Sequence, residues 1–220
     1  MPLAVSGFSE DGRWWWDGQR WIGTSDVVIP DLPVTEFERT GKLDVARRRM
    51  KRQKWLHDAS VVQGLATSGL VQSLGLAVGL PFLVVQRRAL RDYRAWTLEQ
   101  LAAATTHLLG PSEPMVAGET SLHASYWLDD VARDLAVVVT AAHVLVLRID
   151  HLDGQPRWVS LVAHPGEVNM QFYGGPFGYK PTLVVRHAND VFAIQGFSRV
   201  FEPQPVLAAW RQAAAGRVKT

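Results

Sequence analysis

The residues best suited to metal or acid–base chemistry in this chain are its seven histidines, and their spacing does not favour a site. No two lie four residues apart around a glutamate, the arrangement that places two zinc ligands on one helix face. Asp129, Asp130 and Asp134 form a small acidic cluster of the kind found in solvated turns. The glycine-rich residues 174–178 lack the lysine and hydroxyl side chain of a phosphate-binding loop. Because cysteine is also absent, we expect neither an enzyme nor a metal or cofactor site.

A tryptophan-rich stretch, GRWWWDGQRWI at residues 12–22, is the candidate binding site. Asp17 and Gly18, between two aromatic runs, predict a two-residue hairpin turn of type I′, which needs positive φ at both central positions. An earlier turn signal at residues 9–12 leaves room for a third strand before it. A lone hairpin is marginally stable in water, so we expect its aromatic side chains to supply a small core.

The alternation of side chains along a strand divides this hairpin into two faces. The two-residue turn places Trp15 opposite Arg20, and Trp14 opposite Trp21. Trp14, Trp16 and Trp21 then share one face, which we expect to be the small core. Trp15 and Arg20 share the other face, within reach of a cation–π contact. The candidate binding residues are therefore Trp15 and Arg20, with Trp16 and Trp21 beside them.

Charge is divided sharply along the chain. Residues 1–41 carry three basic and seven acidic side chains, whereas residues 42–94 carry eleven basic and three acidic ones. Clustered Lys and Arg suit a nucleic-acid backbone, but beside an apolar run they more simply hold a segment at an anionic lipid surface. We therefore disfavour nucleic acid as a partner, and a solvated helix face is the alternative. The expected membrane-surface residues are Arg47, Arg48, Arg49, Lys51, Arg52, Lys54, Arg87 and Arg88.

Residues 60–86 form an uncharged run of 27 residues, longer than the roughly 20 that a membrane-spanning helix needs. Trp55 and Trp96 lie beyond its ends, as interfacial anchors do. Gly75 and Gly79 have the spacing that lets two spanning helices approach closely, as in a homodimer. Glycines and polar residues dilute the apolar content, however. The alternatives left open are helices packed on the sheet domain and a re-entrant or surface-lying segment.

The last part of the chain, residues 113–220, alternates strand-like runs with turn signals and closes with a helix. Strands in meander order followed by one helix predict an antiparallel bent sheet or partial barrel, whose open end the helix covers. That helix, expected at residues 203–216, carries Val206 and Trp210 on one side and stops at Gly216. The predicted fold class is α+β.

Composition divides the chain into four segments. We predict a tryptophan-rich β-hairpin at 1–25, an extended linker at 26–41, a helical region at 42–110 and the sheet domain at 113–220. The linker assignment rests on two prolines and scattered acidic residues without a sustained period. The helical region is expected to contain long helices, the last of them ending at a Gly-Pro pair.

Two stretches resemble known families. The runs TAAHVLVLRI, WVSLVAHPGEV and VFAIQGFS, followed by a tryptophan-bearing helix, are similar to bacterial pleckstrin-homology-like domains. Trp15, Trp16, Asp17, Gly18 and Trp21 match the short W-W-D-G-x-x-W modules found near the ends of bacterial proteins, often beside membrane spans. The first resemblance implies a β domain with a C-terminal helix, and the second implies no known activity.

Together these patterns predict a non-catalytic, membrane-associated interaction protein of bacterial type. In it the hairpin and the pleckstrin-homology-like domain bind protein partners. The alternative is a soluble cytoplasmic binding or regulatory protein whose apolar helices pack on the sheet domain, and a third is an enzyme on the barrel-like scaffold. The first residues lack a basic stretch followed by an apolar run, so we expect no cleavable signal peptide.

Overall fold

The computed structural model describes residues 7–42, 44–45, 91–121, 135–150, 155–174, 181–196 and 201–216. The chain divides into two compact units, Met1–Pro33 with Thr97–Thr220, and Val34–Trp96. The second unit contains the short helix α1 (Glu36–Arg39) and the first turns of a helix at 91–109. All of the described strands lie in the first unit.

The centre of the first unit is an antiparallel four-stranded sheet in the order β4-β5-β6-β7. Its strands are β4 (Ala117–Thr120), β5 (Leu135–Val139), β6 (Val144–Ile149) and β7 (Pro156–Ala163). β5 and β6 are rich in valine and leucine, which favour strands, and nearly all of their side chains are buried. Because successive side chains point to opposite faces, both faces of this sheet must be covered.

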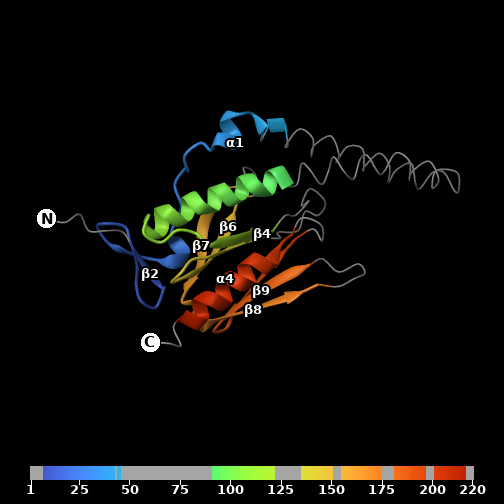
Figure 1. The fold of residues 1–220 in the computed structure, drawn as a ribbon. Helices are drawn as coiled ribbons and strands as arrows, with labels where there is room; N and C mark the ends of the chain where they lie inside the picture. The colour runs from blue at the N-terminus through green and yellow to red at the C-terminus, as the bar shows by residue number, and fades with distance from the viewer. Residues whose placement is uncertain are drawn as a thin grey trace, which may run out of the picture. The chain divides into compact units, whose positions relative to one another are not determined.

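A second, three-stranded antiparallel sheet covers one face together with the C-terminal helix. Its strands are β8 (Val168–Tyr173), β9 (Thr182–His187) and β10 (Asp190–Gln195), in the order β10-β9-β8. Helix α4 (Pro203–Gly216) contacts β4 and β5 of the first sheet and β8 of the second (Figure 1). The indole nitrogen of Trp210 fixes this helix by donating to the carbonyl oxygen of Pro165 at 2.9 Å, in the short helix η3 (Pro165–Glu167).

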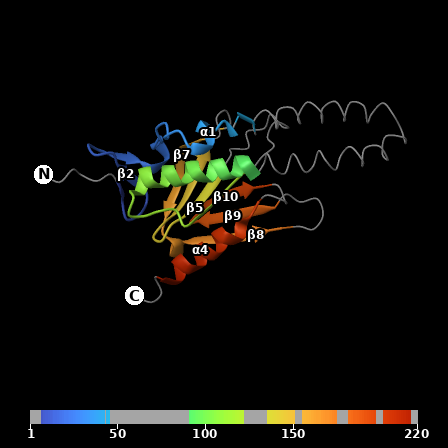
Figure 2. The same ribbon diagram turned by 45° about the horizontal axis from the view of Figure 1, so that its top comes forward.

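Alternate residues of the four-stranded sheet belong to two separate cores. Val137, Val139 and Val144 pack in the core shared with α4 and the three-stranded sheet. Ala136 and Val138 point the other way, into a core that contains Leu101, Ala104 and Leu108 of the 91–109 helix. Both ribbon views place residues 97–109 of this helix across the sheet that contains β6 and β7 (Figures 1 and 2).

The N-terminal segment completes the second core. The short strands β1 (Gly7–Phe8), β2 (Trp14–Trp16) and β3 (Trp21–Gly23) form an antiparallel sheet in that order, followed by η1 (Thr24–Asp26). Val27 and Ile29 are fully buried, and the Ile29 amide donates to the Arg157 carbonyl oxygen at 2.8 Å. Residues 27–32, part of the expected extended linker, pack on the domain through Val27, Ile29 and Leu32, which belong to the second core.

The α+β class, the antiparallel sheets and the closing helix are confirmed. The two strands β5 and β6 are separated by a tight turn, in which the Thr140 hydroxyl accepts the His143 amide at 2.8 Å. The last helix before the sheets ends at residue 109 as expected, and Gly110 follows with a φ of 84°. The long helices expected between residues 46 and 90 lie outside the described residues.

Within the residues that the structure describes, no helix is both long and apolar enough to cross a membrane. The candidate membrane segment at 60–86, its basic flanking residues and the Gly75–Gly79 pair all lie outside that part of the chain. The same is true of Asp129, Asp130 and Asp134.

A buried carboxylate connects β4 to the start of α4, and its removal tests how the helix is held. Glu119 is fully buried and accepts the backbone amides of Thr120 at 3.0 Å and Glu202 at 2.9 Å. Glu119→Ala leaves the Glu202 amide without this acceptor, so we expect a loss of about 2–3 kcal/mol in the free energy of unfolding. Urea denaturation followed by circular dichroism measures it. Glu10→Ala, at an exposed glutamate, is the control, and equal stability of the two variants would contradict this role.

The turn between β9 and β10 offers a stabilising substitution. His187 pairs with Asp190, so the turn consists of Ala188 and Asn189, and Ala188 has a φ of 49°. This left-handed conformation is costly for an alanine and free of strain for a glycine. Ala188→Gly should raise the melting temperature, with a gain of about 0.5–1 kcal/mol. A decrease in the melting temperature would show that the left-handed conformation carries no such cost.

Candidate functional site

The tryptophan-rich hairpin has a longer turn than the sequence predicts. Trp16 pairs with Trp21, and Trp15 pairs with Ile22, so residues 17–20 form a four-residue loop. The Asp17 carboxylate holds this loop by accepting the amides of Gln19 at 2.7 Å and Arg20 at 2.8 Å. The expected two-residue turn, with Trp15 opposite Arg20 and Trp14 opposite Trp21, is therefore wrong. A shift of two residues preserves the faces, however, because side chains alternate with a period of two.

Trp14, Trp16 and Trp21 lie on one side of the hairpin, and we refer to them as the tryptophan face. Their shared face is confirmed, but the expectation that they form a core is wrong. Trp14 is 51% exposed and Trp21 is 54% exposed. The rings of Trp16 and Trp21 lie 5.4 Å apart at 56°, a tilted packing that supports the exposed indoles. Ser9, Trp14 and Trp21 line an open, mainly apolar depression on this face.

Trp15 faces the opposite way and is partly buried against the second core. Its ring lies 6.5 Å from that of Phe8, and both side chains pack against the second core. The Trp15 indole nitrogen is buried without a hydrogen-bond partner among the described residues. The hairpin is therefore anchored through Trp15, the residue expected to recognise a partner, and the other three tryptophans lie on its outer face.

Arg20 lies in the loop and does not make the expected cation–π contact with Trp15. Its side chain is 79% exposed, and its Nε atom lies 3.6 Å from the Asp17 carboxylate. The backbone amides of Arg20 and Gln19 lower the pKa of Asp17, with a smaller contribution from the Arg20 charge. In the preceding turn, hydrogen bonds from the Ser9 hydroxyl and the Arg13 amide lower the pKa of Asp11. Both carboxylates are therefore ionised at neutral pH.

A third carboxylate, that of Asp26, lies at the tryptophan face. Gly23 lies directly opposite Trp14, so Trp14 has no side chain across from it. A Cβ atom built on Gly23 would point to this face and would lie 3.1 Å from Oδ2 of Asp26. The exposed Asp26 carboxylate thus lies next to the position that the side chain of a cross-strand neighbour of Trp14 would take. The only signal in the sequence was a glycine at a strand position, which often marks a close approach.

The backbone fixes the hairpin tightly to the sheet beneath it. Gly12 has a φ of 66°, and a Cβ atom there would collide with the carbonyl oxygen of Val162 in β7. The Thr24 hydroxyl donates to the Gly12 carbonyl oxygen at 2.5 Å, and the Thr24 amide donates to Arg13 at 2.9 Å. The tryptophan face is therefore held in place by buried backbone contacts.

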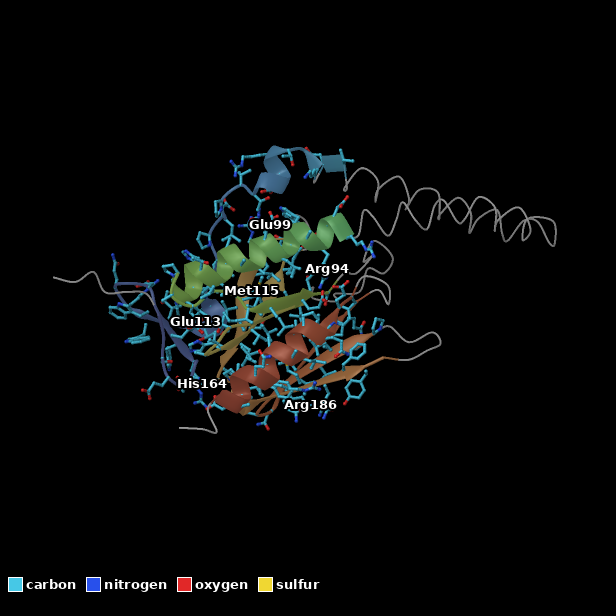
Figure 3. The ribbon with its side chains drawn as sticks, viewed as in Figure 1. Arg94, Glu99, Glu113, Met115, His164 and Arg186 are labelled. Carbon is cyan, nitrogen blue, oxygen red and sulfur yellow. The ribbon has the colours of Figure 1, made fainter. Side chains whose placement is uncertain are left out.

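The second polar cluster joins Glu113, Thr140 and His143. His143 Nδ1 lies 2.7 Å from Glu113 Oε1, and the Thr140 hydroxyl donates to the same oxygen. The His143 ring stacks on His164 with a centroid distance of 5.3 Å, and Figure 3 shows Glu113 and His164 close together. Groups of three or more His, Cys, Asp or Glu side chains able to hold a metal are not found in the described ranges. The cluster fastens residue 113 to the β5–β6 turn.

The expected membrane-surface residues cannot be placed in the site, because they lie outside the described residues. They are Arg47, Arg48, Arg49, Lys51, Arg52, Lys54, Arg87 and Arg88. Comparison of the chain with protein-family models, with curated proteins and with solved structures found no match.

Alanine substitution of single tryptophans tests which face of the hairpin is packed on the second core. Trp15→Ala removes a side chain packed against the second core, so we expect a loss of about 3 kcal/mol in the free energy of unfolding. Trp14→Ala and Trp21→Ala remove side chains that are half exposed and should each cost less than about 1 kcal/mol. Urea denaturation of the three variants tests the order. A greater loss for Trp14→Ala than for Trp15→Ala would contradict the assignment of the faces.

Proposed function

We propose that this chain is a non-catalytic interaction protein that binds a protein partner through its tryptophan face. The observation that carries this proposal is the pair Trp14 and Trp21, both about half exposed on a hairpin whose opposite face is packed on the core. Tryptophan is enriched among the residues that dominate binding free energies, because one large ring buries much apolar area. A rigidly held pair also loses little conformational entropy on binding.

Charge favours a protein partner over an anionic lipid surface at this face. Residues 7–26 carry Arg13 and Arg20 against four carboxylates, a net charge of −2. A negatively charged bilayer would repel this segment, although tryptophan itself suits a membrane interface. The acidic surroundings therefore support a partner that is not itself strongly acidic.

The domain behind the hairpin supports the pleckstrin-homology-like assignment, which we retain as part of the proposal. The supporting features are a four-stranded and a three-stranded antiparallel sheet packed on a common core, followed by a single helix, α4. In this proposal the domain is the scaffold that presents the hairpin, and it offers a second surface for protein partners.

Membrane attachment belongs to the proposal through the uncharged run at 60–86 and the basic residues on both sides of it. The competing hypothesis is a soluble binding protein whose apolar segment packs on protein. Cell fractionation distinguishes the two. Full-length chain that sediments with membranes, and is released by detergent but not by high salt, supports attachment through the apolar run. Full-length chain in the supernatant without detergent contradicts it.

Partner capture with matched variants tests the role of the tryptophan face. The full-length chain with Trp14→Ala and Trp21→Ala should recover its partners at a level at least about tenfold below wild type, because two interface tryptophans are lost. Quantitative mass spectrometry of pull-downs measures recovery. Tyr173→Ala is the control, since Tyr173 is a 50% exposed aromatic residue on β8 in the other sheet.

Two results would contradict the proposal. One is equal recovery of every protein by wild type and the double variant. The other is an unchanged protein profile together with loss of binding to phosphatidylcholine vesicles, which would make lipid the ligand of the tryptophan face. Retention of wild-type recovery by Tyr173→Ala, with loss in the double variant, supports the proposal.

A further inference from the structure

The groups that surround Trp14 determine which kind of partner side chain the tryptophan face can bind. Gly23 has no side chain opposite Trp14, and Oδ2 of Asp26 lies 3.1 Å from the place where a Cβ atom of Gly23 would stand. Trp21 lies on the same face and lines the same depression. Two indoles and a carboxylate are thus presented together on one side of the hairpin.

The charged groups around this place leave the Asp26 carboxylate unneutralised. Arg13 lies 3.9 Å from Asp11, and Arg20 lies 3.6 Å from Asp17, so each arginine offsets the carboxylate next to it. Within the described part of the chain, the Asp26 side chain makes neither a hydrogen bond nor an ion pair. With Glu10 also exposed, the hairpin carries an excess negative charge that a cationic partner would complement.

Aromatic faces and carboxylates attract the same kind of group. The electron-rich face of an indole attracts a cation, most strongly when the ring is tryptophan. A guanidinium group is planar, stacks on aromatic rings and donates in parallel to both oxygens of a carboxylate. A lysine ammonium can approach the same groups but neither stacks nor donates in this forked geometry.

We propose that Trp14, Trp21 and Asp26 bind an arginine side chain of the partner protein. This inference rests on the proposed function and names the chemistry of the partner segment: an arginine-bearing segment that crosses the tryptophan face. The guanidinium stacks on an indole and donates to Asp26, while the neighbouring residues of the segment contact the rest of the face.

A short fluorescent peptide with arginine at alternate positions and glycine between them is the probe. Two control peptides replace every arginine. One carries citrulline, which keeps the shape and removes the charge, and the other carries lysine. Fluorescence anisotropy with the full-length chain should show binding at least about tenfold weaker for the citrulline peptide and weaker for the lysine peptide. Binding of the arginine peptide should also weaken as salt concentration rises.

Two substitutions of equal charge change isolate the role of Asp26. Asp26→Asn should weaken binding of the arginine peptide about fivefold, because a charge-assisted hydrogen bond becomes a neutral one. Glu10→Gln removes one negative charge from the same hairpin and should change binding by less than about twofold. Both residues are exposed, so both variants are expected to unfold at the same urea concentration as wild type. Equal weakening by the two substitutions would overturn the inference.

Selection from a random peptide display library separates this inference from the proposed function. Wild-type chain is used for selection, and the Trp14→Ala, Trp21→Ala variant is used to remove peptides that bind elsewhere. Arginine enrichment among the remaining peptides supports both the proposed function and the arginine inference, provided that the enrichment is lost when the Asp26→Asn variant is the target. Remaining peptides without arginine enrichment overturn the inference and leave the tryptophan face as a docking site. If no peptide depends on the tryptophans, both fail.

Discussion

The burial of both faces of the β5–β6 strand pair is the constraint on which the first unit depends. Valine and leucine occupy successive positions, so alternate side chains enter the core with α4 and the core with residues 97–109. Each fully buried side chain of this size is worth about 1.5–3 kcal/mol, and exposure of either face would forfeit several of them. Each face of the four-stranded sheet must therefore be covered by other elements. The three-stranded sheet and α4 cover one face, and segments that precede β4 in the sequence cover the other.

The second cover explains why a short hairpin at the start of the chain can be stable. Phe8 and Trp15 pack against the second core, and Val27 and Ile29 lie in it. Gly12 brings the backbone of the preceding turn against β7. The hairpin therefore does not need an internal core, which leaves Trp14, Trp16 and Trp21 available on its outer side. In β2, Trp15 thus stabilises the hairpin by packing on the second core, while Trp14 and Trp16 lie on the opposite face, where a partner can bind.

Sequence periodicity predicted the features that depend on neighbouring residues along the chain. It did not predict which surfaces are buried, because burial depends on contacts between residues that are distant in sequence. The alternation of faces in Trp14–Trp16, the end of the 91–109 helix before Gly110 and the closing helix α4 were all accessible from sequence. Which hairpin face is buried was not, because the core against which Trp15 packs includes residues far along the chain, such as Leu101 and Val162. Residues 27–32 looked like a linker for the same reason: an extended segment packs through single side chains, which leave no helical or strand period.

The turn that sequence reasoning misjudged is also the origin of the candidate site. A two-residue turn at Asp17-Gly18 would have paired Trp14 with Trp21 and filled the space beside each ring. Instead the Asp17 carboxylate accepts two amides and stabilises a four-residue loop, which moves the partner strand by two positions. That shift places Gly23 opposite Trp14 and brings Asp26 to the tryptophan face. The hydrogen bonds of the Asp17 carboxylate at one end of the hairpin thus determine that a glycine, and not Trp21, lies directly across from Trp14 at the other end.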